Sequence, residues 1–221
     1  MKRHTLLTIL AAALTTLPCT AQNWQLKIGG GLSTVSRDAA PVGAFKGGIG
    51  YEVEFDQHWT LTPALCIYGK GWKNHNQTVF LYDEEGQQLY DEEGQPRTGI
   101  KNRTTTANYL ELPLLFNYYA RLSEGHYLVF SAGPYAAVGL SGKQKTKGDT
   151  EQQEGGRRFY YETRTFKESG THRFEAGLTA GIGYQLPSHM TVGIEADYGL
   201  TKFNDRGLHN IAALLTLAYQ F

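Results

Sequence analysis

The sequence predicts an all-β fold: an eight-stranded antiparallel transmembrane β-barrel with short periplasmic turns and long extracellular loops. Three observations lead to this prediction. Eight segments alternate apolar and polar residues, short and long connections alternate between them, and the last segment ends in an aromatic residue, Phe221. In a membrane-spanning strand every second side chain faces lipid, so a period of two is the pattern that such a strand requires.

The amino terminus, residues 1–21, has the organisation of a cleaved secretory signal peptide. A basic start precedes the apolar stretch Leu6 to Leu17, which is shorter than the roughly 20 residues that a membrane helix needs. A lipoprotein signal with Cys19 as the lipidated residue is the alternative, although the residues before it are poor neighbours for that processing. We therefore expect a barrel domain over residues 22–221.

The composition suits a barrel better than a soluble domain. The chain holds 26 Gly, 14 Tyr and 10 Phe, and no apolar run after the signal approaches the length of a membrane helix. The 21 basic residues balance the 21 acidic ones, so the basic surface that a nucleic-acid partner requires is missing and we exclude that class. Cys66 is the only cysteine of the expected domain, which excludes an intramolecular disulfide and a cysteine-based metal cluster.

The eight predicted strands each come close to or exceed the length of a tilted membrane strand, about 9 to 11 residues. In order they cover Trp24–Gly31, Gly43–Asp56, Trp59–Trp72, Ala107–Tyr119, Tyr127–Ser141, Arg173–Gln185, Met190–Leu200 and His209–Phe221.

The first four predicted strands are justified by a clean apolar stripe on one face. The stripes are Trp24, Leu26 and Ile28; Phe45, Ile49, Tyr51, Val53 and Phe55; Trp59, Leu61, Leu65 and Ile67; and Leu110, Leu112, Leu114, Phe116 and Tyr118.

The last four predicted strands are justified in the same way, except that Gly133-Pro134 interrupts the fifth. Proline removes a hydrogen-bond donor from the sheet, so we expect a β-bulge there. The stripes of the other three are Phe174, Ala176, Leu178, Ala180, Ile182 and Tyr184; Met190, Val192, Ile194, Ala196 and Tyr198; and Leu215, Leu217, Tyr219 and Phe221.

The connections support this assignment independently. Those over 57–58, 120–126 and 186–189 are short, and those over 33–42, 73–106, 142–172 and 201–208 are long. Short turns face the periplasm and long loops face outside in outer-membrane barrels, where aromatic residues form girdles at both interfaces.

The carboxy-terminal segment also predicts location and partners. Its stripe, Leu215, Leu217, Tyr219 and Phe221, is the expected carboxy-terminal insertion signal, and with the secretory signal it places the chain in the cell outer membrane. We expect outer-membrane lipid, lipopolysaccharide and the barrel-assembly machinery as partners.

Several motifs resemble a known family. They are Tyr109-Leu110-Glu111-Leu112-Pro113-Leu114-Leu115, Lys70-Gly71, Ala132-Gly133-Pro134-Tyr135, Arg173-Phe174-Glu175-Ala176-Gly177-Leu178 and Gly181-Ile182-Gly183-Tyr184. In this order and spacing the chain resembles the outer-membrane β-barrel domain family of porin-like or PorT-like small outer-membrane proteins. The resemblance spans the mature chain and implies an eight-stranded outer-membrane barrel without implying a common activity.

Charged side chains of both signs lie on the inward faces of the predicted strands. An eight-stranded barrel is only wide enough for side chains, so we expect these charges to pair in a packed lumen. A narrow polar conduit or proton-linked gate is the alternative. The expected network comprises Lys27, Lys46, Glu52, Glu54, Lys70, Glu111, Arg173, Glu175, Glu195 and Asp197.

Two external loops carry further signals. The stretch 81–96 is a tandem duplication of Leu-Tyr-Asp-Glu-Glu-Gly-Gln, which predicts two hairpin turns that display six carboxylates. It lacks the ligand alternation of a calcium loop, so we interpret it as a solvated surface and not a metal site. The loop 142–172 holds Lys143, Lys145 and Lys147 and then Arg157-Arg158, which could contact lipopolysaccharide phosphates, another polyanion or the acidic repeat. We favour the contact with the acidic repeat or plain solvation of these residues.

The sequence offers little support for catalysis. His172 near Ser169 and Thr171, and His209 near Thr201 and Asp205, are the suggestive groupings, and neither has a third orienting residue at convincing spacing. We expect no enzyme, no catalytic residue and no cofactor.

The expected role is structural or surface-binding through the long external loops. A narrow porin for small solutes and an accessory component of a secretion or envelope-assembly machine are the alternatives. A soluble lipocalin-like barrel, with apolar residues inside, is the rival fold.

Overall fold

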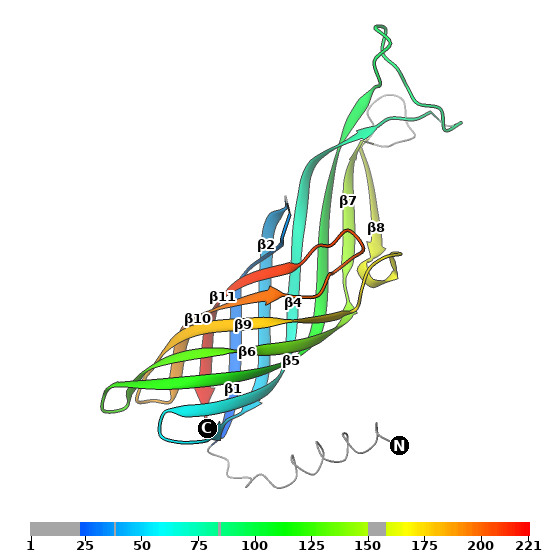
Figure 1. Ribbon diagram of the computed structural model, residues 1–221. Helices are drawn as coiled ribbons and strands as arrows, with labels where there is room; N and C mark the ends of the chain where they lie inside the picture. Colours follow the sequence, from blue (N-terminus) through cyan, green and yellow to red (C-terminus); the bar gives the residue numbers. More distant parts are fainter. Residues whose placement is uncertain (1–22, 38, 84, 150–157) are drawn as a thin grey trace, which may run out of the picture.

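The computed structural model describes residues 23–37, 39–83, 85–149 and 158–221 (Figure 1). The predicted signal peptide therefore lies outside the described residues. The strands of the barrel are β1 (Trp24–Val35), β2 (Ala40–Tyr51), β4 (Trp59–Phe80), β5 (Thr98–Ser123), β6 (His126–Ser141), β9 (Phe174–Gln185), β10 (Met190–Gly199) and β11 (Asn210–Gln220). The remaining elements are β3 (Val53–Glu54), β7 (Lys143–Asp149), β8 (Arg158–Arg164) and a short 3-10 helix, η2 (Thr165–Lys167).

Within the described residues, eight strands close into an antiparallel ring. Each strand pairs with the next one along the chain, in the order β1-β2-β4-β5-β6-β9-β10-β11, and β11 pairs back with β1. At the seam the Phe221 amide donates to the carbonyl of Trp24 at 2.9 Å, so these two residues meet at one end of the barrel. The predicted eight-stranded barrel is confirmed, because full closure leaves no unpaired edge in the ring.

The two faces of the ring differ in the way that a membrane requires. Outward-facing Leu215 is 70% exposed and Ile28 is 54% exposed, whereas inward-facing Lys46 is 5% exposed and Glu111 is 0% exposed. This apolar-outside, polar-inside arrangement is the reverse of a lipocalin-like barrel, and so the soluble rival fold is wrong. In the part of the chain that the structure describes, no helix has the length and apolar character needed to span a membrane.

The end of the barrel where Trp24 and Phe221 meet has short turns, as predicted. The β9–β10 turn is closed by the His189 amide, which donates to the Leu186 carbonyl at 3.1 Å. In the turn before β4, one Asp56 oxygen accepts the amides of His58 and Trp59 at 2.7 and 2.8 Å. These two hydrogen bonds hold the pKa of the Asp56 carboxyl below its usual value, because they favour the charged form.

The opposite end carries the long connections, as predicted, but parts of two of them are strands. β4 has 22 residues and β5 has 26, at least twice the roughly 9 to 11 residues that a membrane crossing needs. Their outer halves continue with β7 and β8 as an open sheet in the order β4-β5-β7-β8, which stands above the ring in Figure 1. The predicted loops over 73–106 and 142–172 therefore contain strand residues at 73–80, 98–106, 143–149 and 158–164. We call this sheet (residues 73–80, 98–105, 143–149 and 158–164) the extension.

The connection over 33–42 is also shorter than predicted, because β1 continues to Val35 and β2 begins at Ala40. Outside the membrane no lipid demands an apolar face, so strands there carry polar residues on both faces and resemble loops in the sequence.

The β-bulge predicted at Gly133-Pro134 is wrong. The pairing of β6 with β9 runs without interruption through Gly133↔Thr179 and Pro134↔Leu178. Gly133 instead permits close approach of β5, since a Cβ at this position would lie 1.9 Å from the carbonyl oxygen of Leu114. The bulge in β6 lies nearer its end, where Asn108↔Ser141 is followed by Tyr109↔Gly139.

Candidate functional site

The lumen is organised in levels that follow the inward-facing side chains of β4. From the periplasmic end outward these are Thr60, Thr62, Cys66, Tyr68, Lys70 and Trp72. Polar residues occupy the first levels, charged residues the middle and aromatic residues the last.

Lys46 lies at the centre of the charged levels. Its Nζ is 2.7 Å from Glu111 Oε1, 2.8 Å from Glu195 Oε1 and 3.4 Å from Asp197 Oδ2. These carboxylates come from β5 and β10, so the contacts cross the lumen and join β2 to strands elsewhere in the ring. Asp197 is additionally held by the Thr179 hydroxyl, which donates to it from β9.

Lys70 and Lys27 extend the network on either side of Lys46. The Nζ of Lys70 is 2.8 Å from Glu175 Oε1 and 3.5 Å from Glu111 Oε2, so Glu111 lies between two lysines. Lys27 pairs with Glu195 from the periplasmic side. We call these seven residues (Lys27, Lys46, Lys70, Glu111, Glu175, Glu195 and Asp197) the lumen network.

Aromatic rings surround the lysines. The Tyr68 ring lies between Lys46 and Lys70, with the two Nζ atoms 4.8 and 4.3 Å from its centroid. Lys70 is also 4.7 Å from the ring of Tyr135, whose hydroxyl donates to Glu175 at 2.7 Å. Cation–π attraction and hydroxyl donation thereby supplement the ion pairs, which compensates for the removal of these charges from water.

Three residues of the predicted network lie outside it. Glu52 is buried nearer the periplasm, where it accepts the hydroxyls of Thr60 and Tyr119 and has no cation beside it in the described contacts. Glu54 follows it at the end of the strand and is exposed. Arg173 is exposed at the other end, where it donates to the Gly139 carbonyl at 3.1 Å.

Alternation predicted the side of the strand on which these three residues lie, but their position along the barrel axis puts them beyond the charged levels. Conversely, three residues that contact the lumen network were not predicted from the sequence: Tyr109, Tyr135 and Asn210. Alternation along their strands places all three side chains on the inward face. That they lie at the same level as Lys70 can be recognised only once the register between the strands is known.

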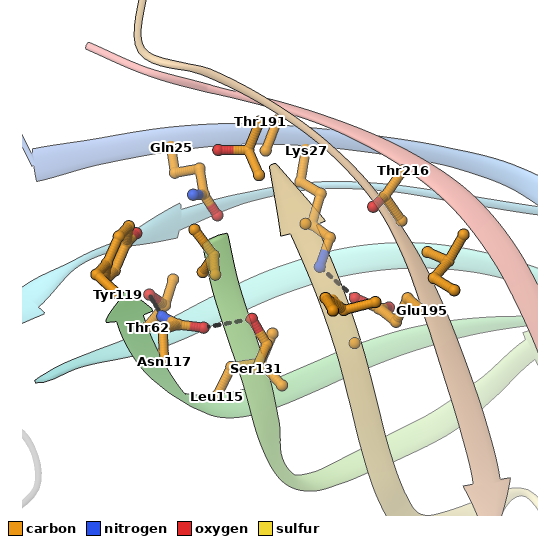
Figure 2. Close-up of a pocket in the computed structure, with 16 residues that line it drawn as sticks. Gln25, Lys27, Thr62, Leu115, Asn117, Tyr119, Ser131, Thr191, Glu195 and Thr216 are labelled. Carbon is orange, nitrogen blue, oxygen red and sulfur yellow. Dashed lines mark hydrogen bonds and ion pairs between the residues drawn. The ribbon is translucent and has the colours of Figure 1, made fainter. Parts of the chain in front are cut away.

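The periplasmic half of the lumen is polar and partly hollow. It contains a cavity of about 50 Å³. The labelled residues that line this cavity extend from Gln25 and Tyr119 to the Lys27–Glu195 pair (Figure 2). Asn117 bridges one wall, because it donates to Thr62 at 2.9 Å and accepts from Ser131 at 2.7 Å. A wider mouth of about 750 Å³, bordered by Glu54, lies below it.

Aromatic residues close the other end of the lumen. Trp72 and Phe203 pack edge to face with centroids 4.8 Å apart, and Phe166 of η2 lies 6.4 Å from Phe203 and 5.8 Å from Tyr109. We call these four rings the aromatic plug. Above the lumen network, therefore, the extracellular end of the barrel is filled by packed side chains.

A polar cleft of about 250 Å³ lies directly over the aromatic plug. One wall is the inner face of the extension, and the other consists of the segments 168–171 and 204–208. Trp72 and Phe203 form part of its floor, and its polar lining is Asn74, Arg103, Thr105, Gln144, Glu168, Ser169, Thr171, Asn204, Asp205 and Arg206. We call this the outer cleft.

The histidine groupings that could suggest catalysis are engaged in other contacts. The two ring nitrogens of His172 lie 3.1 Å from the Lys202 carbonyl and 3.1 Å from Asp205, so neither ring nitrogen faces Ser169. His209 contacts the Gly199 carbonyl at 3.0 Å, and Asp205, which sequence spacing associates with His209, pairs with His172 instead.

The tandem repeat forms two equivalent turns at the tip of the extension. Asp83 accepts the Glu85 and Gln87 amides at 2.9 and 2.8 Å, and Asp91 accepts the equivalent amides at 3.0 and 2.8 Å. Because the Asp83 and Asp91 carboxylates accept backbone hydrogen bonds, their role in the repeat is to stabilise the turns and not to bind a metal ion. Among the described residues, no group of three His, Cys, Asp or Glu is placed to hold a metal ion.

Comparison with known proteins agrees with this architecture. The family model for the outer membrane protein β-barrel domain matches residues 20–205. No curated protein matches the chain.

Among solved structures, the chain is similar to Ail, the attachment invasion locus protein of Yersinia pestis, in complex with the heparin analogue sucrose octasulfate. That match has 14% identity, covers 90% of this chain and 99% of that chain, and has a TM-score of 0.40. The chain is also similar to the outer membrane enzyme PagL, with 12% identity over 89% and 99% of the two chains and a TM-score of 0.39. A third similar structure is the translocator domain of the autotransporter NalP from Neisseria meningitidis. That match has 10% identity, covers 99% of this chain and 95% of that chain, and has a TM-score of 0.29. Since the family model spans most of the chain, the protein belongs to the outer membrane protein β-barrel domain family and is located in the outer membrane.

Proposed function

We propose that the protein is a non-conducting surface-binding barrel that takes a hydroxyl-rich ligand, such as a saccharide, in the outer cleft. The observation that supports this most is the position of the cleft: a concave polar site opens to the outside directly above an aromatic plug. The barrel then acts as a rigid base that holds the cleft at the cell surface, and the ligand does not pass through it.

The absence of conduction follows from how the lumen is filled. An ion entering from the outside meets the aromatic plug and then the lumen network, whose lysines and carboxylates lie between 2.7 and 3.5 Å apart across the barrel. Separating such pairs inside a narrow barrel leaves uncompensated buried charges, which costs several kcal/mol. Eight-stranded barrels have interiors that side chains can fill, so no wider path is required.

The chemistry of the outer cleft supports a hydroxyl-rich ligand. Arg103 and Arg206 offer donors, Glu168 and Asp205 offer acceptors, and the amides of Asn74 and Gln144 offer both. A saccharide hydroxyl both donates and accepts, so it can use this mixture, and its apolar ring face can pack against the aromatic floor. A single strong anion or cation would find groups of its own sign in the same cleft.

Trp72 provides a direct test, because it lies in the cleft floor while Trp24 and Trp59 lie in strands at the periplasmic end. In a Trp24→Phe/Trp59→Phe background, we expect the emission of Trp72 to shift when a binding saccharide is added to the refolded protein. Arg103→Gln should weaken binding about tenfold, whereas Arg37→Gln, outside the cleft, should not change it. An unchanged spectrum across a broad panel of neutral and acidic saccharides would contradict the proposal.

A narrow porin is the second candidate, and one observation favours it. The periplasmic mouth and the lumen cavity form a polar approach that reaches Lys27 and Glu195 from below. Movement of the network and of the plug would both be needed to complete a path. Conductance measurements separate the two candidates, because only the porin carries steady current.

A further inference from the structure

The outward face of β7 is a row of exposed lysines. Lys143, Lys145 and Lys147 point outward, and the residues between them, Gln144 and Thr146, are buried on the inner face of the extension. A strand of alternating lysines on an exposed face presents several positive charges in one direction with a repeat of about 7 Å.

A β-bulge turns the lysines outward. Along β6 the outward positions are even-numbered and apolar, ending with Val138 and Leu140. The register shift opposite Asn108 and Tyr109 inserts one extra residue at this point, so that odd-numbered positions face outward from Lys143 onward. Without that residue the lysines would point inward, because a shift of one residue exchanges the two faces of a strand.

Neighbouring strands widen this row into a basic face. Cross-strand partners share a face, and Thr104 of β5 has Lys73 and Lys145 as its partners on either side. Lys143 lies opposite Arg164 of β8, and Lys145 lies opposite Glu162. We call Lys73, Lys143, Lys145, Lys147 and Arg164 the basic face. Glu162 lies on the same face and pairs with Lys143 at 2.6 Å. Among the side chains that the structure describes on this face, basic groups therefore outnumber acidic ones.

The position of the basic face relative to the membrane is given by the same strand. Lys143 follows the lipid-facing Leu140 by three residues, a distance of about 10 Å along an extended chain. Because the strand is tilted, the rise along the membrane normal is smaller, and flexible lysine side chains bring their charges to the headgroup level. On β5 the outward positions also change there, from Leu110 to Asn108 and Thr106.

We propose that the basic face binds the phosphate groups of phosphorylated glycolipids in the outer leaflet, and thereby fixes the extension to the membrane surface. Charge complementarity and continuity with the lipid-facing belt carry this inference, because an ammonium group beside the outermost apolar residues meets headgroup phosphates first. The site is separate from the outer cleft, which lies on the inner face of the extension, so the inference does not depend on the proposed function.

The test uses the mature chain refolded into phosphatidylcholine vesicles that contain either bisphosphorylated lipid A or the same lipid A without its phosphates. After extraction in mild detergent and affinity purification, the lipid A retained per barrel is measured by mass spectrometry. We expect about tenfold more of the bisphosphorylated form to be retained, and a decrease of this enrichment as salt concentration rises.

Three variants make the result specific. Lys143→Gln/Lys145→Gln/Lys147→Gln should abolish the enrichment, and the corresponding triple substitution by Arg should preserve it. Arg37→Gln/Arg97→Gln/Lys202→Gln, which removes equal charge from other extracellular segments, should leave it unchanged. The heat-dependent shift in electrophoretic mobility verifies folding of each variant, and the Arg variant keeps the test valid if the Gln variant fails to fold.

Equal retention of the two forms of lipid A would overturn the inference, as would an enrichment that survives in the Gln variant. Tight binding of a soluble sulfated polysaccharide through the same lysines, without lipid A enrichment, would also overturn it and would indicate an external polyanion as the partner. Failure of this test leaves saccharide binding at Trp72 unaffected, so the two proposals fail independently.

Discussion

Lys46 shows how single residues stabilise this barrel from within. It is 5% exposed and holds Glu111, Glu195 and Asp197, which belong to two strands other than its own. Without the Lys46 ammonium group, the three carboxylates would repel one another in the narrow lumen with fewer positive charges to compensate them. Buried charges of this kind stabilise a fold only while every partner is present.

Lys46→Met should therefore be strongly destabilising. Removing one partner from a buried ion-pair cluster costs about 3–5 kcal/mol, so we expect the free energy of unfolding, measured by urea titration in vesicles, to fall by that amount. Lys145→Met removes the same charge from an exposed site and should change stability by less than about 1 kcal/mol. Equal effects of the two substitutions would show that the network contributes no more than a surface charge.

Asp56 provides a pH-dependent element at the periplasmic end. Hydrogen bonds from the His58 and Trp59 amides depress its pKa in the folded state, so its contribution to stability is present above the unfolded-state value near 3.9. That contribution is lost as the pH falls through the lower folded-state pKa. The protection of these two amides against hydrogen exchange, taken relative to the intrinsic exchange rate at each pH, should decrease over this acidic range in the wild type, and Asp56→Asn should show a smaller dependence of protection on pH. An identical profile in both proteins would contradict this account of the turn.

At the scale of elements, the lipid-facing parts of the strands could be predicted from sequence and the extension could not. Inside the membrane, lipid requires an apolar side chain at every second position, as Leu215, Leu217 and Tyr219 illustrate. Beyond it, β7 carries Lys143 on one face and Gln144 on the other, and both are polar. Only pairing with β5, a long-range contact, shows that this segment is a strand.

The same reasoning explains what was missed in the lumen. Alternation predicts that Glu54 and Arg173 lie on inward faces, but closure at a particular register decides which residues reach the same level. Lys46 pairs with Glu195 although 149 positions separate them in the sequence. The height of a residue along the barrel axis depends on the stagger between neighbouring strands, and the sequence of a single strand does not determine that stagger.

The tandem repeat should be removable as a unit. Leu81, Leu89 and Arg97 lie eight residues apart and are joined in a cycle by backbone hydrogen bonds. The Leu81 amide donates to the Arg97 carbonyl at 3.0 Å, the Leu89 amide to the Leu81 carbonyl at 2.9 Å and the Arg97 amide to the Leu89 carbonyl at 2.9 Å. Deleting residues 81–88 places Leu89 after Phe80 and leaves one turn of the same geometry. We expect the melting temperature of the barrel to stay within about 2 °C of wild type, because the ring and its network are untouched.

The control is a deletion of residues 81–84 alone, which removes half of one eight-residue repeat and should expose the tip to proteolysis. Equal protease resistance of the two deletion variants would contradict the interpretation that the repeat is a structural unit.

At the scale of the whole molecule, the barrel is asymmetric along its axis. Polar cavities occupy the periplasmic half, the lumen network occupies the middle, and the aromatic plug closes the outer end beneath the cleft. The extension stands at this outer end (Figure 1). The strands that carry the extension, β4 and β5, also contribute Lys70 and Glu111 to the network. The lumen network and the external surface thus depend on the same elements.

Planar-bilayer conductance of the refolded chain 22–221 tests the central claim, closure of the lumen, most directly. We predict no steady current from the wild type, because the side chains of the lumen network and of the aromatic plug occupy the barrel interior between the periplasmic cavity and the outer cleft. A Trp72→Ala/Phe203→Ala/Lys46→Ala variant, which removes side chains from both barriers, should show openings if it folds. Steady unitary conductance of the wild type, altered when Glu111 and Glu195 become Gln, would contradict the account and identify the protein as a small porin.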